Sequence, residues 1–198
     1  DIFWVARLGE SAVAGVGVTE SLLTVVYGLA LGISMATTAM VARRTGEKDA
    51  EGAAKAAAQS ILLGLVVSAV IAAPGFFFAV KLLGWMGAEP AVIAASVDYT
   101  RVIFLSAPSI LLLFLMNAVF RGAGDAAIAM RVLWAANLLN IVLDPIMIFG
   151  FGPVPALGVA GAAWATAVGR TFGVCLQLAA FMKHRGRINI ATRHFAPS

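Results

Sequence analysis

The sequence predicts an all-α protein, a polytopic bundle of transmembrane helices, on three observations. Hydrophobic residues make up 61% of the 198 residues and charged residues only 12%, and the mean hydropathy is +0.95. Soluble domains, by comparison, are about half apolar and about a quarter charged. Charged residues also collect in short clusters between apolar runs, and these runs reach the roughly 20 residues that a helix needs to cross a bilayer. The net charge of +4 therefore follows membrane topology, so we expect lipid around the chain and no nucleic-acid partner.

Residues 1–182 are predicted to form one transmembrane domain with one partial and five complete spans. Asp1 and the following "IFWVARLG" look like the end of a helix that starts upstream. The spans are expected at about residues 1–8, 18–41, 56–83, 102–120, 128–150 and 157–182. Residues 84–98 are expected to form an outer loop with a short amphipathic helix, in which Pro90 suits the first turn. The polar residues 183–198 are interpreted as a cytoplasmic linker.

The basic residues predict the orientation of the chain. Ten of the 14 lysines and arginines fall in the connections 42–55 and 121–131 and in the tail, whereas three fall on the other side and one inside a span. Cytoplasmic loops carry an excess of lysine and arginine. The two connections are therefore predicted to be cytoplasmic, and residues 151–156 are predicted to form an external turn.

Polar residues inside the expected spans are arranged on single helical faces. Asn137, Asn140 and Asp144 stand at i, i+3 and i+7 in the fourth complete span, and Thr166 and Arg170 share a face of the last span. Polar faces of this kind point toward a bundle interior or a water-filled cavity. Because asparagine and threonine often only join helices by hydrogen bonds, a purely structural role for Asn137 stays open.

Glu20 and Tyr27 form another polar face, in the first complete span. A charge near the middle of a spanning helix costs about 2.5–3.5 kcal/mol on insertion scales, so Glu20, Asp144 and Arg170 need a physical reason to be there. They could pair with one another and lock helices together, or they could line a cavity. We expect Glu20 and Arg170 to face the bundle interior, with Arg170 within salt-bridge reach of Glu20 or Asp144.

Three polar residues on three different spans are expected at a similar depth in the outer half of the membrane. At 1.5 Å per residue, Asp144 lies about 9 Å from the outer end of its span. Asp1 lies a similar distance before the outer turn that follows it, and Thr166 lies a little deeper, measured from the turn before its span. A common depth is what a single cation or proton site requires.

Pro145 fits such a site because it has no N–H, so the carbonyl of Ile141 loses its helical partner and the helix is expected to bend. Carboxylate, amide, hydroxyl and free carbonyl oxygens are the ligands that a hard cation such as sodium prefers. Burial also disfavours the charged form of a carboxylate, so Asp1 or Asp144 could exchange a proton instead.

Five motifs, in order along the chain, resemble those of the multidrug and toxic compound extrusion (MATE) transporters. They are "DIFWVARLG", "ALGISMATTAMVARRTGEKD", "FRGAGDA", "NIVLDPIMIFGFG" and "LGVAGAAWAT". The resemblance implies a secondary active transporter with two pseudo-symmetric six-helix lobes, of which this chain is similar to the first. The remaining C-terminal lobe of the same protein would then be a partner.

The resemblance also implies an activity and a set of site residues. MATE transporters export organic cations and other amphipathic small molecules across the inner membrane, driven by proton or sodium entry, and they use no cofactor besides the coupling ion. In one branch of the family the first lobe couples ion to transport, and motif by motif its residues fall on Asp1, Asn140, Asp144 and Thr166. Glu20 and Arg170 depart from many relatives, which leaves the ion preference open.

Other functions were weighed against this one. "GAGD" at 122–125 matches the signature of intramembrane aspartyl proteases. Asp125, however, falls in a predicted cytoplasmic turn, and its candidate partner Asp144 lies about 28 Å further along the helix. No zinc-ligand cluster, serine elbow or phosphate loop appears in the sequence, so we expect no enzyme. A lipid-linked oligosaccharide flippase of the same superfamily and an inert truncated lobe remain alternatives.

Overall fold

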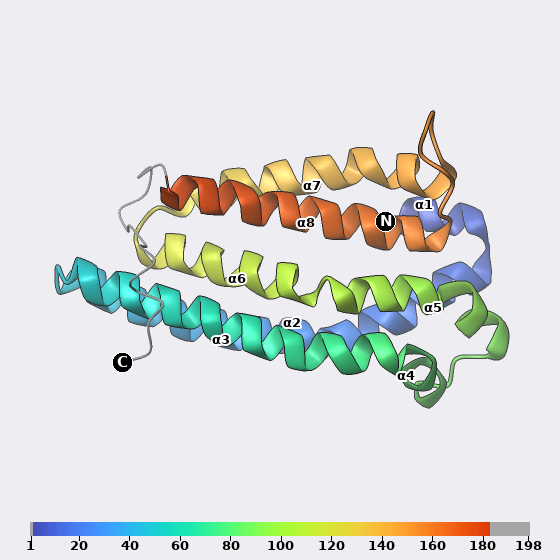
Figure 1. The fold of residues 1–198 in the computed structure, drawn as a ribbon, viewed down its shortest axis with the longest axis horizontal. Helices are drawn as coiled ribbons and strands as arrows, with labels where there is room; N and C mark the ends of the chain where they lie inside the picture. Colours follow the sequence, from blue (N-terminus) through green and yellow to red (C-terminus); the bar gives the residue numbers. More distant parts are fainter. Residues whose placement is uncertain (1, 183–198) are drawn as a thin grey trace. The chain divides into compact units, whose positions relative to one another are not determined.

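The computed structural model describes residues 2–182 and confirms the all-α prediction (Figure 1). The elements are α1 (Ile2–Val5), the 3₁₀ turn η1 (Ala6–Leu8), α2 (Glu10–Gly46), α3 (Ala50–Phe77), α4 (Ala79–Trp85), α5 (Pro90–Leu105), α6 (Ala107–Gly122), α7 (Ala126–Phe149) and α8 (Val159–Met182). Extended pairing within the described residues is limited to an isolated bridge between Phe151 and Val154. The expected linker at 183–198 and the site residue Asp1 lie outside the described residues.

Within residues 2–182, four helices are long and apolar enough to cross a membrane, namely α2, α3, α7 and α8, and the pair α5 and α6 could form a fifth span. The expected span at 18–41 is shorter than α2, whose 37 residues correspond to about 55 Å of helix. A hydrocarbon core of about 30 Å covers only part of that length. Helical structure therefore continues beyond the apolar run at both ends, where polarity had suggested loops.

The expected span at 102–120 is the largest departure from the sequence prediction. Pro90 does start a helix, as predicted, but α5 runs on from there through most of the supposed outer loop. The helix then breaks at Ser106, whose hydroxyl donates to the carbonyl of Ile103 at 2.8 Å. Pro108 has no N–H for the carbonyl of Phe104, so the regular ladder cannot run through this position.

The expected span at 56–83 is divided as well. The helix α3 ends at Phe77, and the short helix α4 follows after Phe78, which has non-helical backbone angles. Pro74 lies inside α3, where it removes one backbone donor. Backbone geometry, rather than loss of apolar character, therefore sets this boundary.

The described residues divide into two compact units, and α2, α3, α7 and α8 each contribute to both. The first unit covers residues 2–27, 69–107 and 137–169, and the second covers 28–68, 108–136 and 170–182. The second unit holds a hydrophobic core in which small alanines of α3 face larger side chains of α6 and α8. Within that core, the rings of Phe120 and Phe181 stack with their centroids 4.3 Å apart.

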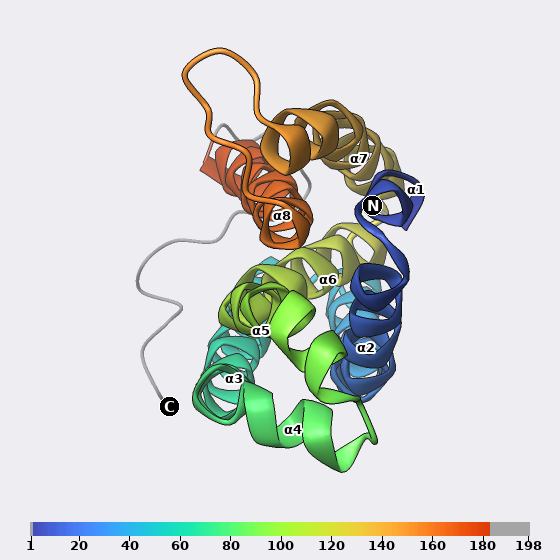
Figure 2. The same cartoon turned by 90° about the vertical axis from the view of Figure 1, so that its right-hand side faces the viewer.

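The connection between α7 and α8, in the first unit, is the loop 150–158, which extends away from the helix ends and can be followed in Figure 2. Gly150 adopts a left-handed φ of 80°, which suits glycine at a helix C-terminus. The N–H of Leu157 donates to the carbonyl of Met147 at 3.0 Å, and the N–H of Gly158 donates to that of Ile148 at 3.1 Å. These bonds satisfy carbonyls that the end of α7 would otherwise leave without partners, and they fix the register of α8 beside α7.

The two basic connections both belong to the second unit, as 47–49 and 123–125. Arg43 and Arg44 form ion pairs with Glu47, and Arg44 also pairs with Asp49, at 2.9–3.4 Å. Because these side chains are 40–78% exposed, the pairs are worth little stability.

The orientation remains a prediction that labelling can check. In a Cys175→Ser background, a cysteine at Lys48 is expected to react with a membrane-impermeant maleimide only after the cells are opened. A cysteine at Pro153, in the exposed α7–α8 connection, should react in intact cells. Labelling of position 48 from outside would reverse the assignment.

Candidate functional site

A buried polar cluster in the first unit brings together three of the predicted site residues. The side-chain nitrogen of Asn140 donates to Asp144 Oδ1 at 3.3 Å and to Thr166 Oγ1 at 3.2 Å. Asp144 is 2% exposed and Thr166 is 7% exposed, and Asn140 is half-buried. One amide therefore joins a buried carboxylate of α7 to a buried hydroxyl of the next helix.

Local sequence explains how this cluster forms. Asn140 and Asp144 are four residues apart on α7, which places them on one face of the helix, one turn from each other. Thr166 comes from α8, and Gly161 allows this helix to approach α7 closely. A Cβ atom at Gly161 would overlap the carbonyl of Met147 and lie 2.8 Å from the nitrogen of Ile148. A glycine at this position thus sets the helix separation at which the amide of Asn140 reaches Thr166.

The chemistry of the cluster suits a small monovalent cation or a proton. It offers one carboxylate, one amide and one hydroxyl, and oxygen ligands of this kind suit hard cations. No group of three or more histidine, cysteine, aspartate or glutamate side chains comes together in residues 2–182, so the cluster does not have the donor set typical of a zinc site.

The remaining predicted residues lie in different places. Asn137 is exposed on α7 and is not among the residues that hydrogen bonds bring together here, although it shares the sequence stripe of Asn140. Pro145 lies inside α7, and the helix continues across it to Phe149. The bend and the free Ile141 carbonyl expected there stay predictions.

The predicted charge partners are also separate. Glu20 is half-buried in the first unit, where the hydroxyl of Tyr99 donates to its Oε1 at 3.4 Å. Tyr27 is half-buried on the same helix. Arg170 is half-buried and belongs to the second unit, so its pairing with Glu20 or Asp144 stays a prediction.

Two polar contacts were missed from the sequence. Tyr99 lies between the outer loop expected at 84–98 and the span expected from about 102, so no contact with Glu20 was predicted; the helix start at Pro90 was the signal that could have found it. In the second unit, Gln177 donates to Asn117 Oδ1 at 2.7 Å, and Gln177 is fully buried. The amides of α6 and α8 therefore join these helices as structural hydrogen bonds often do in membranes.

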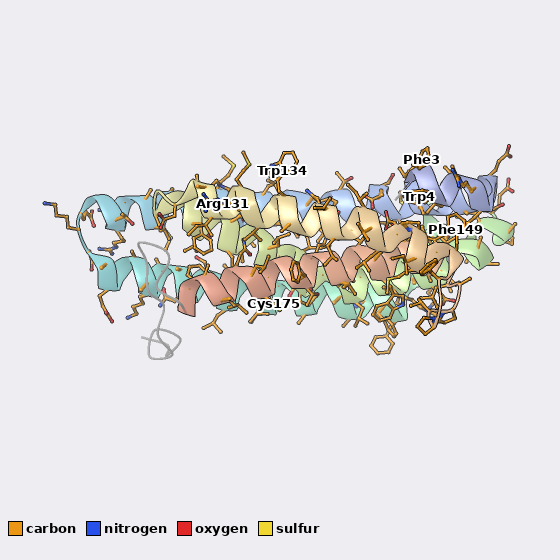
Figure 3. The ribbon with its side chains drawn as sticks, turned by 90° about the horizontal axis from the view of Figure 1, so that it is seen from above. Phe3, Trp4, Arg131, Trp134, Phe149 and Cys175 are labelled. Atoms are coloured by element: carbon orange, nitrogen blue, oxygen red, sulfur yellow. The ribbon has the colours of Figure 1, made fainter. Side chains whose placement is uncertain are left out.

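The short helix α1 contacts the end of α7 through aromatic side chains (Figure 3). The ring of Trp4 meets that of Phe149 edge to face at 6.2 Å, and Phe3 packs against Trp4 at 5.0 Å. The guanidinium of Arg7 lies 5.0 Å from the Trp4 ring centroid, a distance at which the cation is attracted to the ring. The beginning of the chain is thus attached to the helix that carries Asn140 and Asp144.

Apolar helices long enough to span a bilayer, with a buried carboxylate hydrogen-bonded between two of them, are features of a multi-pass membrane protein. Within that class the chain belongs to the MatE family, whose model matches residues 1–146. The prediction from the five motifs is thereby confirmed. The relatives among the matches are named as transporters and export proteins.

Curated relatives match 90–100% of the chain but are much longer than it. A protein named FAD transporter, from Shewanella oneidensis, is 29% identical over 93% of this chain and 41% of its own length. A probable multidrug resistance protein of Bacillus subtilis, YoeA, is 28% identical over 90% of this chain and 38% of its own. The multidrug export protein MepA of Staphylococcus aureus is 27% identical over 100% of this chain and 43% of its own length. The chain thus spans about two fifths of the length of these relatives.

Solved structures show the same relationship. A crystal structure of MATE in the bent conformation superposes with a TM-score of 0.91 at 33% identity, over 100% of this chain and 43% of that one. A transporter of the MOP superfamily from Pyrococcus furiosus, described as having a binding pocket of reverse polarity, gives 0.89 at 33% identity with the same coverage. The chain has the fold of the N-terminal lobe of these two-lobe transporters.

Proposed function

We propose that this chain is the N-terminal lobe of a cation-coupled exporter in the inner membrane, in which Asn140, Asp144 and Thr166, together with Asp1, bind the coupling ion. The single observation that supports this most is the buried carboxylate of Asp144, joined through the Asn140 amide to a hydroxyl on the next helix. The match to multidrug exporters supports the direction and kind of transport.

In the proposed mechanism the ion and the resting hydrogen bonds compete for the same atoms. The nitrogen of Asn140 now faces both Asp144 and Thr166. A cation in the cluster would repel that N–H group, and rotation of the amide would present its oxygen instead. Entry of a proton or sodium would also remove the net charge of Asp144, which favours a bent, collapsed lobe. Loss of the ion restores the anion and attracts a cationic substrate, so the two occupants exclude each other.

The proposed substrates are amphipathic organic cations, and two observations support anionic substrates as the alternative. The relative from Shewanella oneidensis is named FAD transporter, and FAD is an anion. Arg170 is a half-buried cation in a spanning helix, which is what a transporter of anionic compounds such as lipid-linked sugars would need. The C-terminal lobe, which we propose as the partner of this chain, would complete the substrate cavity.

The test is transport by the full-length protein in proteoliposomes, with proton and sodium gradients imposed separately. An organic dye cation is expected to move against its gradient when one of the two ions moves down its own. FAD and a lipid-linked oligosaccharide serve as the comparison substrates. Transport of the anions alone, or dye movement that neither gradient drives, would contradict the proposal.

A further inference from the structure

A second carboxylate lies in a spanning helix of the first unit, on a different helix from the ion cluster. Glu20 is half-buried on α2. Its Oε1 accepts a hydrogen bond from the hydroxyl of Tyr99, on α5, at 3.4 Å. Because Tyr99 is only 1% exposed, its ring is fixed by packing and its hydroxyl holds the carboxylate in one direction.

The interface between α2 and α5 around Glu20 keeps the orientation of its carboxylate fixed. The hydroxyls of Thr19 and Thr100, the neighbours of Glu20 and Tyr99 in sequence, are hydrogen-bonded to each other at 2.8 Å. Gly15 approaches Ser96 so closely that a Cβ atom added there would overlap that side chain. Helices in a membrane are joined stably by close packing of small residues and by hydrogen bonds between hydroxyl groups. Glu20 therefore lies at the edge of a closely packed interface between α2 and α5.

Glu20 lacks a cationic partner among the described residues. Ion pairs among the described residues include Arg43–Glu47, Arg44–Asp49 and Arg101–Asp98, and Glu20 belongs to none of these. An ionised carboxylate within a spanning helix is costly when no opposite charge compensates it. A cation that arrives from outside the lobe would remove that cost, so the site is suited to binding one.

The surface beside Glu20 favours an organic cation over a small inorganic ion. The exposed side of α2 next to it carries Gly17, Ser21 and Thr24, and a Cβ atom at Gly17 would meet nothing within 4 Å. The two hydroxyls donate to carbonyls of their own helix, at 3.0 and 3.2 Å. A hard cation needs several oxygen ligands, whereas a bulky organic cation needs one carboxylate and open, weakly polar space.

An aromatic ring adds to the same face. Tyr27 stands seven residues after Glu20 on α2, which is two turns along the same side of the helix. Faces of aromatic rings attract organic cations. The two positions are about 10 Å apart along the helix, a distance that a bulky aromatic cation can span.

We propose that Glu20, positioned by Tyr99, binds the cationic group of an organic-cation substrate. This inference rests on the proposed transport function, but it assigns substrate recognition to α2 and α5 and leaves ion coupling to Asn140, Asp144 and Thr166. Tyr99 would act as a positioning residue, since it is buried and reaches the substrate only through Glu20.

Equilibrium binding tests this proposal independently of transport. The full-length protein in lipid nanodiscs is dialysed against radiolabelled tetraphenylphosphonium, a permanent cation, and separately against FAD. Glu20→Gln keeps the size and the acceptor for Tyr99 but removes the charge, and we expect it to raise the Kd for the cation about threefold to tenfold. Binding of FAD should not weaken. Glu20→Asp should keep most of the cation affinity, and Tyr99→Phe should raise the Kd by less than Glu20→Gln does.

Glu10→Gln is the matched control, because Glu10 is an exposed carboxylate at the start of the same helix, and its Kd should equal that of the wild type. A wild-type Kd for Glu20→Gln would overturn the proposal and leave the Tyr99 bond as a structural contact. A Glu20→Gln variant that shifts the pH profile of transport for both substrates would assign Glu20 to proton exchange instead. Asp144→Asn is expected to lower ion-driven efflux, whereas Glu20→Gln should weaken equilibrium binding of the cation, so failure of the ion site and failure of the substrate site give different results.

Discussion

Full-length protein that carries Asp144→Asn is expected to reach the membrane in normal amounts and to lose ion-driven efflux by about tenfold to a hundredfold. The amide has nearly the shape of the carboxylate and is cheaper to bury than a charge, so insertion should not suffer. It cannot take up a proton or neutralise sodium, however, and a hydrogen-bonded charge is worth about 1.5–3 kcal/mol. The measurement is dye efflux from cells or vesicles under an imposed ion gradient, at matched expression.

Asn137→Ala is the control for this experiment, because Asn137 lies on the same helix but is exposed. Its efflux should stay within twofold of the wild-type rate, which corresponds to a loss of at most about 0.4 kcal/mol. Efflux at the wild-type rate by Asp144→Asn would show that Asp144 is a structural residue and that the ion couples elsewhere. Loss of efflux together with loss of the protein from the membrane would assign Asp144 to folding.

The second large effect is expected at a residue without a side chain. Gly161→Ala should destabilise the protein by about 1–3 kcal/mol or more, the usual range for overpacking, since the new methyl group would overlap backbone atoms of Met147 and Ile148. Backbone cannot rotate away as a side chain would, so α8 must move from α7. The distance from Asn140 to Thr166 would increase, and efflux should fall with stability.

Thermal unfolding of the purified full-length protein measures this effect. Gly32→Ala provides the matched control, because a Cβ atom at Gly32 would meet nothing within 4 Å and alanine is the better helix former by about 1 kcal/mol. A Gly161→Ala protein with a melting temperature at or above that of Gly32→Ala would show that α7 and α8 are not in close contact at this point.

Much of the fold could be predicted from the sequence because lipid leaves few choices. A run of apolar residues must be helical in a bilayer, and this rule located the helices α2, α3, α7 and α8. Helix ends were less predictable, since α2 extends beyond its apolar core into residues such as Glu10 and Gly46. The break at Ser106 was missed because hydropathy does not register backbone donors, although Pro108 carried the signal.

The candidate site could also be predicted only in part from the sequence. Asn140 and Asp144 share a helix, so their spacing alone placed them together, and the common depth of Thr166 suggested the third member. The partner of Glu20 was not predictable by either rule. Tyr99 lies between the outer loop expected at 84–98 and the span expected from about 102, and only the structure shows that it is buried on α5. Tertiary packing therefore decides which polar residues of a helix meet.

The hairpin formed by α7 and α8 has a consequence for how the protein enters the membrane. Of the four single-helix candidate spans, α8 is the least apolar, and its buried Thr166 finds its partner Asn140 on the helix made just before it. The polar groups of the cluster thus hydrogen-bond to one another within a single helical hairpin. The residues that we assign to transport therefore also lower the cost of inserting the helix pair that carries them.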